Sequence, residues 1–167
     1  MKLTKLERLN LINQYLILEK LYPEEQETYS TLRTALEKGF EYHYEEAIEW
    51  IHDDFPEHNS EFVIDVLDMY SVILLSYSNL EDKGELIDSK VNFPGFDGNN
   101  ETAFLGYARY FIRDLGRFDE LKENATFRDF NSHRPMVPKY RRMVSAWKST
   151  NDQYNLTIDD ISTILNA

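Results

Sequence analysis

Apolar residues recur along this chain with the three- and four-residue spacing of α-helices, and no segment shows the two-residue alternation of a half-buried strand. The pattern starts in residues 4–21, where Thr4 and Glu7 have the spacing of a capping box and predict the beginning of a helix. The apolar positions that repeat at helical spacing in this segment are Leu6, Leu9, Ile12, Tyr15 and Leu16.

A second helix is predicted between Pro23 and Gly39, because proline suits the first turn of a helix and glycine suits its end. The connection to the first helix is short, so residues 1–39 should form an antiparallel helical hairpin. A third, shorter helix is predicted over residues 41–52, and it should end before Pro56 because the residue preceding a proline disfavours helical backbone.

The longest apolar segment, residues 62–80, contains only Asp65 and Asp68 as charged residues and predicts a helix that is buried on most sides. We expect this helix to begin at Ser60 and to form the centre of the fold. Later helices are expected over residues 101–116, from Pro135 or Pro138 through Trp147, and after Thr157, with a long connection over residues 82–99 and an irregular segment over residues 117–134.

These elements predict an all-α protein, with an N-terminal helical hairpin over residues 1–39 packed on an orthogonal multi-helix bundle over residues 40–167. The chain has 167 residues, which is an ordinary size for one domain. We therefore expect the hairpin and the bundle to fold as one cooperative unit.

The cysteine count and the apolar runs limit the classes of protein that this chain can belong to. There is no cysteine, which excludes disulfides, thiolate chemistry and cysteine-ligated zinc. No apolar run reaches the roughly 20 residues of a membrane span, and the first residues lack the apolar core of a signal peptide. We therefore expect a cytoplasmic protein with no membrane contact.

The net charge of −12 is divided unevenly along the chain. Residues 1–104 hold 8 Lys and Arg against 22 Asp and Glu, whereas residues 105–148 hold 10 against 5. The two segments can neutralise each other within one molecule or between subunits, or the basic segment can offer a patch to an anion. The sequence leaves these alternatives open.

Arginines in the basic segment are one candidate for a binding surface. Arg109 and Arg113 lie four residues apart, so both should face the same side of one helix. Aromatic residues such as Tyr140 are interleaved with the basic ones, a combination that suits phosphate groups and stacked bases. Pairing with the acidic segment is the more ordinary interpretation, and the overall acidity disfavours RNA as a partner.

Residues 128–133 carry the one pattern that indicates catalysis. Arg128 and His133 have the Arg-x4-His spacing of HEPN-type ribonucleases, which are also all-α. A histidine can act as general acid or base near neutral pH, and an arginine can stabilise the charge on a phosphate in the transition state. The spacing is short enough to arise by chance, so the alternative is an ordinary loop histidine near a helix N-terminus.

Two further segments are weighed and given structural interpretations. Phe96 lies in a glycine-containing loop, where its ring either binds a partner or fills the core beneath the loop, and we favour the core. His52 and His58 lie among acidic residues but match no metal-ligand spacing. We therefore predict no metal site and no cofactor.

Short motifs that occur in order through the whole chain carry a family resemblance. They are Asn13-Gln14-Tyr15, Asp65 with Met69-Tyr70, Ser78-Asn79-Leu80, Phe93 with Gly95-Phe96-Asp97, Leu105-Gly106-Tyr107-Ala108-Arg109, Phe130-Asn131, Pro135-Met136, Lys139-Tyr140 with Met143 and Trp147, and Asn166-Ala167. These motifs resemble those of the YfbU family of small bacterial helical proteins. The resemblance implies an all-α fold and a cytosolic bacterial protein. It assigns no biochemical activity to the chain.

Taken together, the residues favour a non-enzymatic helical protein, with a regulatory role, that binds another protein or associates with itself as a homo-oligomer. The alternative is an RNA-binding protein or a HEPN-like, metal-independent ribonuclease that uses Arg128 and His133. The candidate binding residues are Arg109, Arg113, Asn131, Tyr140 and Phe96.

Overall fold

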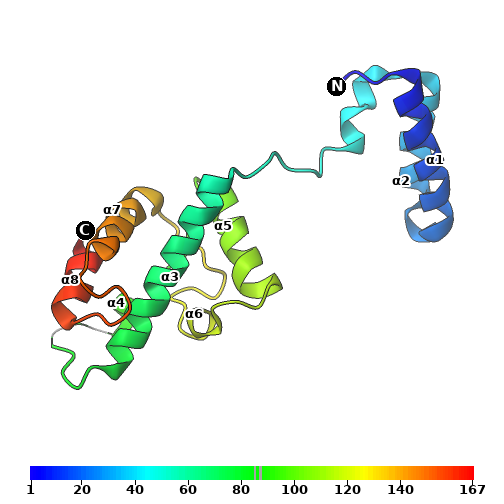
Figure 1. The fold of residues 1–167 in the computed structure, drawn as a ribbon. Coiled ribbons are helices and arrows are strands. Elements are labelled where there is room, and N and C mark those ends of the chain that lie inside the picture. Colours follow the sequence, from blue (N-terminus) through cyan, green and yellow to red (C-terminus); the bar gives the residue numbers. More distant parts are fainter. Residues whose placement is uncertain (85, 87) are drawn as a thin grey trace. The chain divides into compact units, whose positions relative to one another are not determined.

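The computed structural model describes residues 1–84, 86 and 88–167, and in this part of the chain all extended regular elements are helices (Figure 1). The all-α prediction is confirmed. The first elements are α1 (Lys5–Leu21), the 3-10 turn η1 (Pro23–Glu25), α2 (Gln26–Lys38) and the 3-10 turns η2 (Glu41–His43) and η3 (Glu45–Ala47). The later ones are α3 (Glu57–Asn79), α4 (Asp88–Val91), α5 (Thr102–Arg109), the π-helical turn η4 (Tyr110–Asp114), α6 (Asp119–Glu123), α7 (Val137–Lys148) and α8 (Ile158–Asn166).

The chain divides into two compact units, Met1–Asp54 and Phe55–Ala167, which we call the N-terminal unit and the C-terminal unit. The N-terminal unit contains the hairpin of residues 1–39 and also residues 40–54, which we had expected in the bundle. The packing of the hairpin on the bundle and their folding as one cooperative unit stay predictions.

In the N-terminal unit, α1 and α2 form the predicted hairpin around a small core. Thr4 and Glu7 make the predicted capping box, with the Glu7 amide donating to Thr4 Oγ1 at 3.3 Å and Glu7 Oε2 accepting from the Thr4 amide at 2.7 Å. Arg33 on α2 forms an ion pair with the buried Glu19 of α1 at 2.6 Å, which ties the two helices together. The buried apolar residues of this core are Tyr15, Ala35, Leu36, Tyr44 and Ala47.

The predicted third α-helix over residues 41–52 is wrong. This segment instead makes two short 3-10 turns, in which Tyr44 and Ala47 are the only buried residues. The three-residue spacing of this pair matches the 3-10 repeat. A short α-helix needs an apolar stripe packed on a neighbour, and the segment has no such stripe because Trp50 and Ile51 stay exposed.

The central helix of the C-terminal unit is α3, as predicted. Val63, Val66 and Ile73 have no exposed surface, and α3 packs against α5 on one side and α7 and α8 on the other (Figure 1). The helix begins at Glu57 with Pro56 as its N-cap, rather than at Ser60.

One predicted helix takes a different form in the structure, and two others begin as predicted. The helix expected over 101–116 is α5 followed by η4, so its second half is a π-helical turn. Helix α7 has Pro138 in its first turn. Thr157 and Asp160 form the predicted capping box of α8, and Leu156 and Ile161 are both buried in the core beneath it.

Candidate functional site

The sequence candidates gather where two irregular segments of the C-terminal unit meet. Residues 92–100 and 124–136, which we call the paired loops, are joined by the Phe96 amide donating to the Phe130 carbonyl oxygen at 3.0 Å. The Ser132 amide donates to the Phe96 carbonyl oxygen at 3.1 Å. A Cβ atom on Gly95, whose φ is +90°, would lie 1.7 Å from the Phe130 carbonyl oxygen. The two backbones therefore approach this closely only because residue 95 is glycine.

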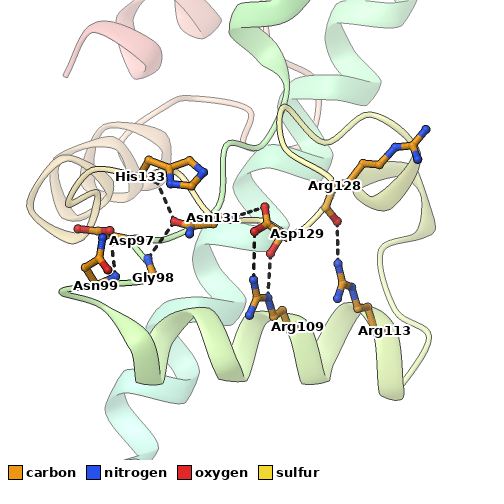
Figure 2. Close-up of polar contacts among 9 residues, drawn as sticks. All are labelled: Asp97, Gly98, Asn99, Arg109, Arg113, Arg128, Asp129, Asn131 and His133. Atoms are coloured by element: carbon orange, nitrogen blue, oxygen red, sulfur yellow. Dashed lines mark hydrogen bonds and ion pairs between the residues drawn. The ribbon is translucent and has the colours of Figure 1, made fainter.

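Arg109 and Arg113 face the same side, as predicted, and both hold the second of the paired loops. Arg109 Nε donates to the Asp129 carbonyl oxygen at 2.8 Å, and Arg113 Nη2 donates to the Arg128 carbonyl oxygen at 2.7 Å (Figure 2). The ion pair of Arg109 with the Asp129 carboxylate is long, at 3.5 Å. Both guanidinium groups therefore position a loop, and an external anion would have to compete with these bonds.

The side chain of Asn131 bridges the paired loops by hydrogen bonds. Its Oδ1 accepts from the Gly98 amide at 2.9 Å and from the His133 amide at 3.0 Å. The backbone amide of Asn131 donates to Asp129 Oδ1 at 3.1 Å (Figure 2). Because this oxygen has two lone pairs, the two backbone donors use its capacity to accept, and only the side-chain NH2 group is left for a ligand. The structure thus gives Asn131 a role in shaping the loops.

Phe96 and Tyr140, which we named as candidate binding residues, are core residues, as the favoured interpretation of Phe96 expected. Both side chains are 0% exposed. The Tyr140 hydroxyl donates to the Gly95 carbonyl oxygen at 2.8 Å, and the Phe96 ring stacks on Phe104 at 5.8 Å between centroids. The physical reason is that the loop folds the Phe96 ring inward, where it packs against the Tyr140 ring on the buried side of α7, at 5.3 Å between centroids.

Arg128 and His133 lie well apart in the second of the paired loops, and the Arg128 side chain extends away from His133 (Figure 2). Both are exposed. The His133 ring packs edge-on against Phe127 at 5.5 Å, and its backbone has a positive φ of 54°. In this arrangement the two side chains do not converge on one substrate atom, which general acid–base catalysis requires.

Glu101 is a structurally important carboxylate that the sequence did not reveal. It is 7% exposed, and its Oε1 accepts from the amides of Met136 and Val137 at 2.8 and 2.7 Å. Its Oε2 accepts from the Asp97 amide at 3.1 Å. Glu101 therefore caps α7 from 35 residues away and fixes both paired loops. No local pattern signals such a cap, because its donors come from a distant segment.

Asp97 is a second buried acid of the paired loops. Its carboxylate accepts from the Asn100 side-chain amide at 2.5 Å and from the Asn99 backbone amide at 3.1 Å. These hydrogen bonds, that from the Asn100 side chain first, hold the pKa of Asp97 below its usual range. Asp97 is thus a charged turn-forming residue at physiological pH.

A different kind of surface lies on α1 of the N-terminal unit. Tyr15 faces α2, whereas a set of large apolar side chains on the opposite side of α1 is 45–67% exposed. In the fully described N-terminal unit, no other element covers this set. We call it the outer face of α1, and it consists of Leu6, Leu9, Leu16, Ile17 and Leu21.

The outer face contains most of the apolar positions that repeat at helical spacing in this helix. The most regular apolar positions, Leu6, Leu9 and Leu16, lie outside rather than in the core of the hairpin. The helix is apolar on two sides, so periodicity alone could not distinguish the side that packs on α2 from the side left uncovered.

The residues that the structure describes contain neither a candidate membrane span nor a candidate metal cluster. No helix there combines the length and the apolar character needed to cross a bilayer. No group of three or more His, Asp or Glu side chains is gathered there as a metal site.

Known proteins resemble this chain over its whole length. The model of the YfbU domain matches residues 1–167. UPF0304 protein MJECS11 of Methanocaldococcus jannaschii is 40% identical over an alignment of 169 positions, which covers 99% of each chain. Neither description states an activity, a substrate or a partner. The chain therefore belongs to the YfbU family, as its motifs indicated.

Proposed function

We propose that this chain is a non-enzymatic protein that acts by self-association, and that a second copy of the chain binds the outer face of α1. The observation that carries this proposal is the exposure of five large apolar side chains on one helix of a unit whose own core is small. Contiguous apolar patches of this kind mark interaction sites in soluble proteins.

The energetics favour a weak but specific assembly. Full burial of a leucine or isoleucine side chain contributes about 1.5–3 kcal/mol, so burying the exposed half of each contributes about 1 kcal/mol. Two copies of the five-residue face would then gain about 10 kcal/mol, against an association cost of about 4–15 kcal/mol. At the low end of this cost, the net gain of about 6 kcal/mol corresponds to a dissociation constant on the order of tens of micromolar.

The arrangement of the face supports a second copy as its occupant, rather than an unrelated protein. Asn13 lies at the centre of the face, with Leu9 four residues before it and Ile17 four residues after it. In an antiparallel pair of α1 helices with a two-fold axis at Asn13, Leu9 of each copy would meet Ile17 of the other. Such self-complementarity is what a two-fold symmetric interface requires.

The central asparagine adds specificity to this pairing. One polar residue in an otherwise apolar helix seam fixes register and the number of partners, at a cost in affinity. Two Asn13 side chains at the axis could bond each other, since each amide offers both a donor and an acceptor.

The alternative function, an RNA-binding protein or a HEPN-like ribonuclease, has less geometric support. The Arg128 side chain extends away from His133, and Tyr140 is buried. Cleavage by this pair would need a rearrangement of a loop that Asn131 and Glu101 hold in place.

Sedimentation velocity of the full chain tests the proposal. Leu9→Lys replaces an apolar contact in each copy by a charge, which should weaken association by at least about 100-fold. The matched control is Leu75→Lys, because Leu75 is also an exposed helical leucine, at 60%, but lies on α3. A monomeric wild type at every concentration, or equal weakening in both variants, would refute the proposal.

A further inference from the structure

A cleft of about 520 Å³ opens in the C-terminal unit between α3, α4, α7, α8 and the paired loops. Three cationic side chains, those of Lys90, Arg134 and Lys139, line it. None of the residues that line it in the described part of the chain is acidic. In a chain with a net charge of −12, we would not expect a cleft whose charged lining residues, in the described part of the chain, are all cations.

The cations of this cleft are not neutralised by the protein. Among the described residues, no carboxylate forms an ion pair with Lys90, Arg134 or Lys139. Arg142, three residues after Lys139 on α7, is already occupied, since its Nε donates to the Ala167 oxygen at 2.5 Å. The basic segment of the sequence is therefore left open at this cleft.

The charge of Arg134 influences two other residues that line the cleft, Lys139 and Tyr70. Partial burial lowers the pKa of Lys139, and the charges of Arg134 and Arg142 lower it further. Burial raises the pKa of the Tyr70 phenol at the floor, and the nearby charge of Arg134 opposes that shift. A half-buried lysine beside two arginines is an arrangement that an anion would stabilise.

The rest of the site is rigid. Ser132 Oγ donates to the Arg134 carbonyl oxygen at 2.7 Å, and Glu101 holds the amides of Met136 and Val137. These bonds fix the backbone on both sides of Arg134. They also occupy the amides of Met136 and Val137 at the start of α7, so these two amides are not available to an anion.

We propose that this cleft binds a small phosphate monoester, with Arg134 and Lys139 on the phosphate and the remaining space on its organic group. A guanidinium fork with an adjacent ammonium suits the tetrahedral oxygens of a phosphate. The volume exceeds what inorganic phosphate needs and lies within the range of about 300–1,000 Å³ for small-molecule sites. Phe127, which is 38% exposed at the rim, offers a ring to a flat group.

The test is an NMR titration of the full chain, following backbone amide shifts as potassium phosphate replaces potassium chloride at constant ionic strength. We expect saturable shifts around the cleft in the wild type. Arg134→Gln and Lys139→Met should each weaken phosphate binding by about 10- to 100-fold, the loss expected for a hydrogen bond to a charged group. The control Arg117→Gln removes the same charge from an exposed position outside the cleft and should change the affinity less than threefold.

A second readout keeps folding and binding apart. Because no carboxylate in the described part of the chain pairs with the side chains of Arg134 and Lys139, both variants should unfold at or above the wild-type temperature in chloride. The proposal is overturned if the wild type shows no saturable shift at millimolar phosphate, or if Arg117→Gln weakens binding as much as Arg134→Gln. Neither result bears on self-association, which involves the other unit.

A parallel titration with adenosine monophosphate distinguishes the two sources of the phosphate. Tighter binding than inorganic phosphate, with the increment lost in Phe127→Ala, would assign the remaining space to an organic group. Equal affinity would assign the cleft to free phosphate.

Discussion

Glu101 offers a sharp test of how the paired loops are held, through the isosteric change Glu101→Gln. Glutamine keeps one oxygen for the amides of Met136 and Val137, but it places an NH2 group against the Asp97 amide. That buried donor would lose its acceptor, at a cost of about 1–3 kcal/mol, and two charge-assisted bonds would become neutral, at about 1 kcal/mol each. Relief of the desolvation of a charge offsets part of this loss. We therefore expect a net destabilisation of about 3 kcal/mol.

Differential scanning calorimetry measures this effect. For the C-terminal unit, Phe55–Ala167, a loss of about 3 kcal/mol corresponds to a fall of roughly 10 °C in Tm. The control Glu61→Gln makes the same chemical change at an exposed position of α3 and should move Tm by no more than about 2 °C. A fall of less than about 3 °C in Glu101→Gln would show that the carboxylate is not the anchor of α7, and the reasoning would fail.

Three further outcomes are expected. Gly95→Ala should abolish cooperative unfolding of the C-terminal unit, measured by near-UV circular dichroism, because its Cβ would collide with the Phe130 carbonyl oxygen; a variant within about 1 kcal/mol of wild type would contradict this. Hydrogen bonds from the threonine N-caps lower the pKa of Glu7 and Asp160 in the folded state. The stability that these two carboxylates contribute is therefore complete above pH about 4.3 and is lost as the pH falls through their pKa values in the folded state. Urea midpoints that stay constant from pH 6 to 3 would contradict this expectation. His133→Ala should leave the behaviour of the chain toward RNA unchanged, with no metal-independent cleavage by either protein; cleavage that only the wild type performs would restore the ribonuclease alternative.

Local sequence signals predicted the parts of the fold that depend on neighbouring residues. The capping boxes at Thr4 and Thr157 and the buried helix α3 follow from short-range hydrogen bonds and from composition, which the sequence displays directly. The segment 41–52 failed because its apolar residues suggested a helix, whereas the unit offered cover only for Tyr44 and Ala47.

The candidate sites were harder to predict because they depend on distant contacts. Phe96 and Tyr140 were candidate binding residues because of their residue type and neighbours, but only the folded structure shows that both rings fill the core. The hydrogen bonds that Asn131 and Glu101 accept from backbone amides join segments more than 30 residues apart. Pairing over such distances leaves no trace in spacing or periodicity.

The most direct test of self-association through α1 is oxidative cross-linking of Asn13→Cys. The chain contains no other cysteine, so a covalent dimer can arise only through position 13. Paired helices with axes about 8–10 Å apart bring facing Cα atoms, each about 2.3 Å from its axis, within the range of a disulfide. We predict rapid formation of a covalent dimer by Asn13→Cys at micromolar concentration and little by Leu75→Cys. Equal and slow cross-linking of the two variants would contradict the account.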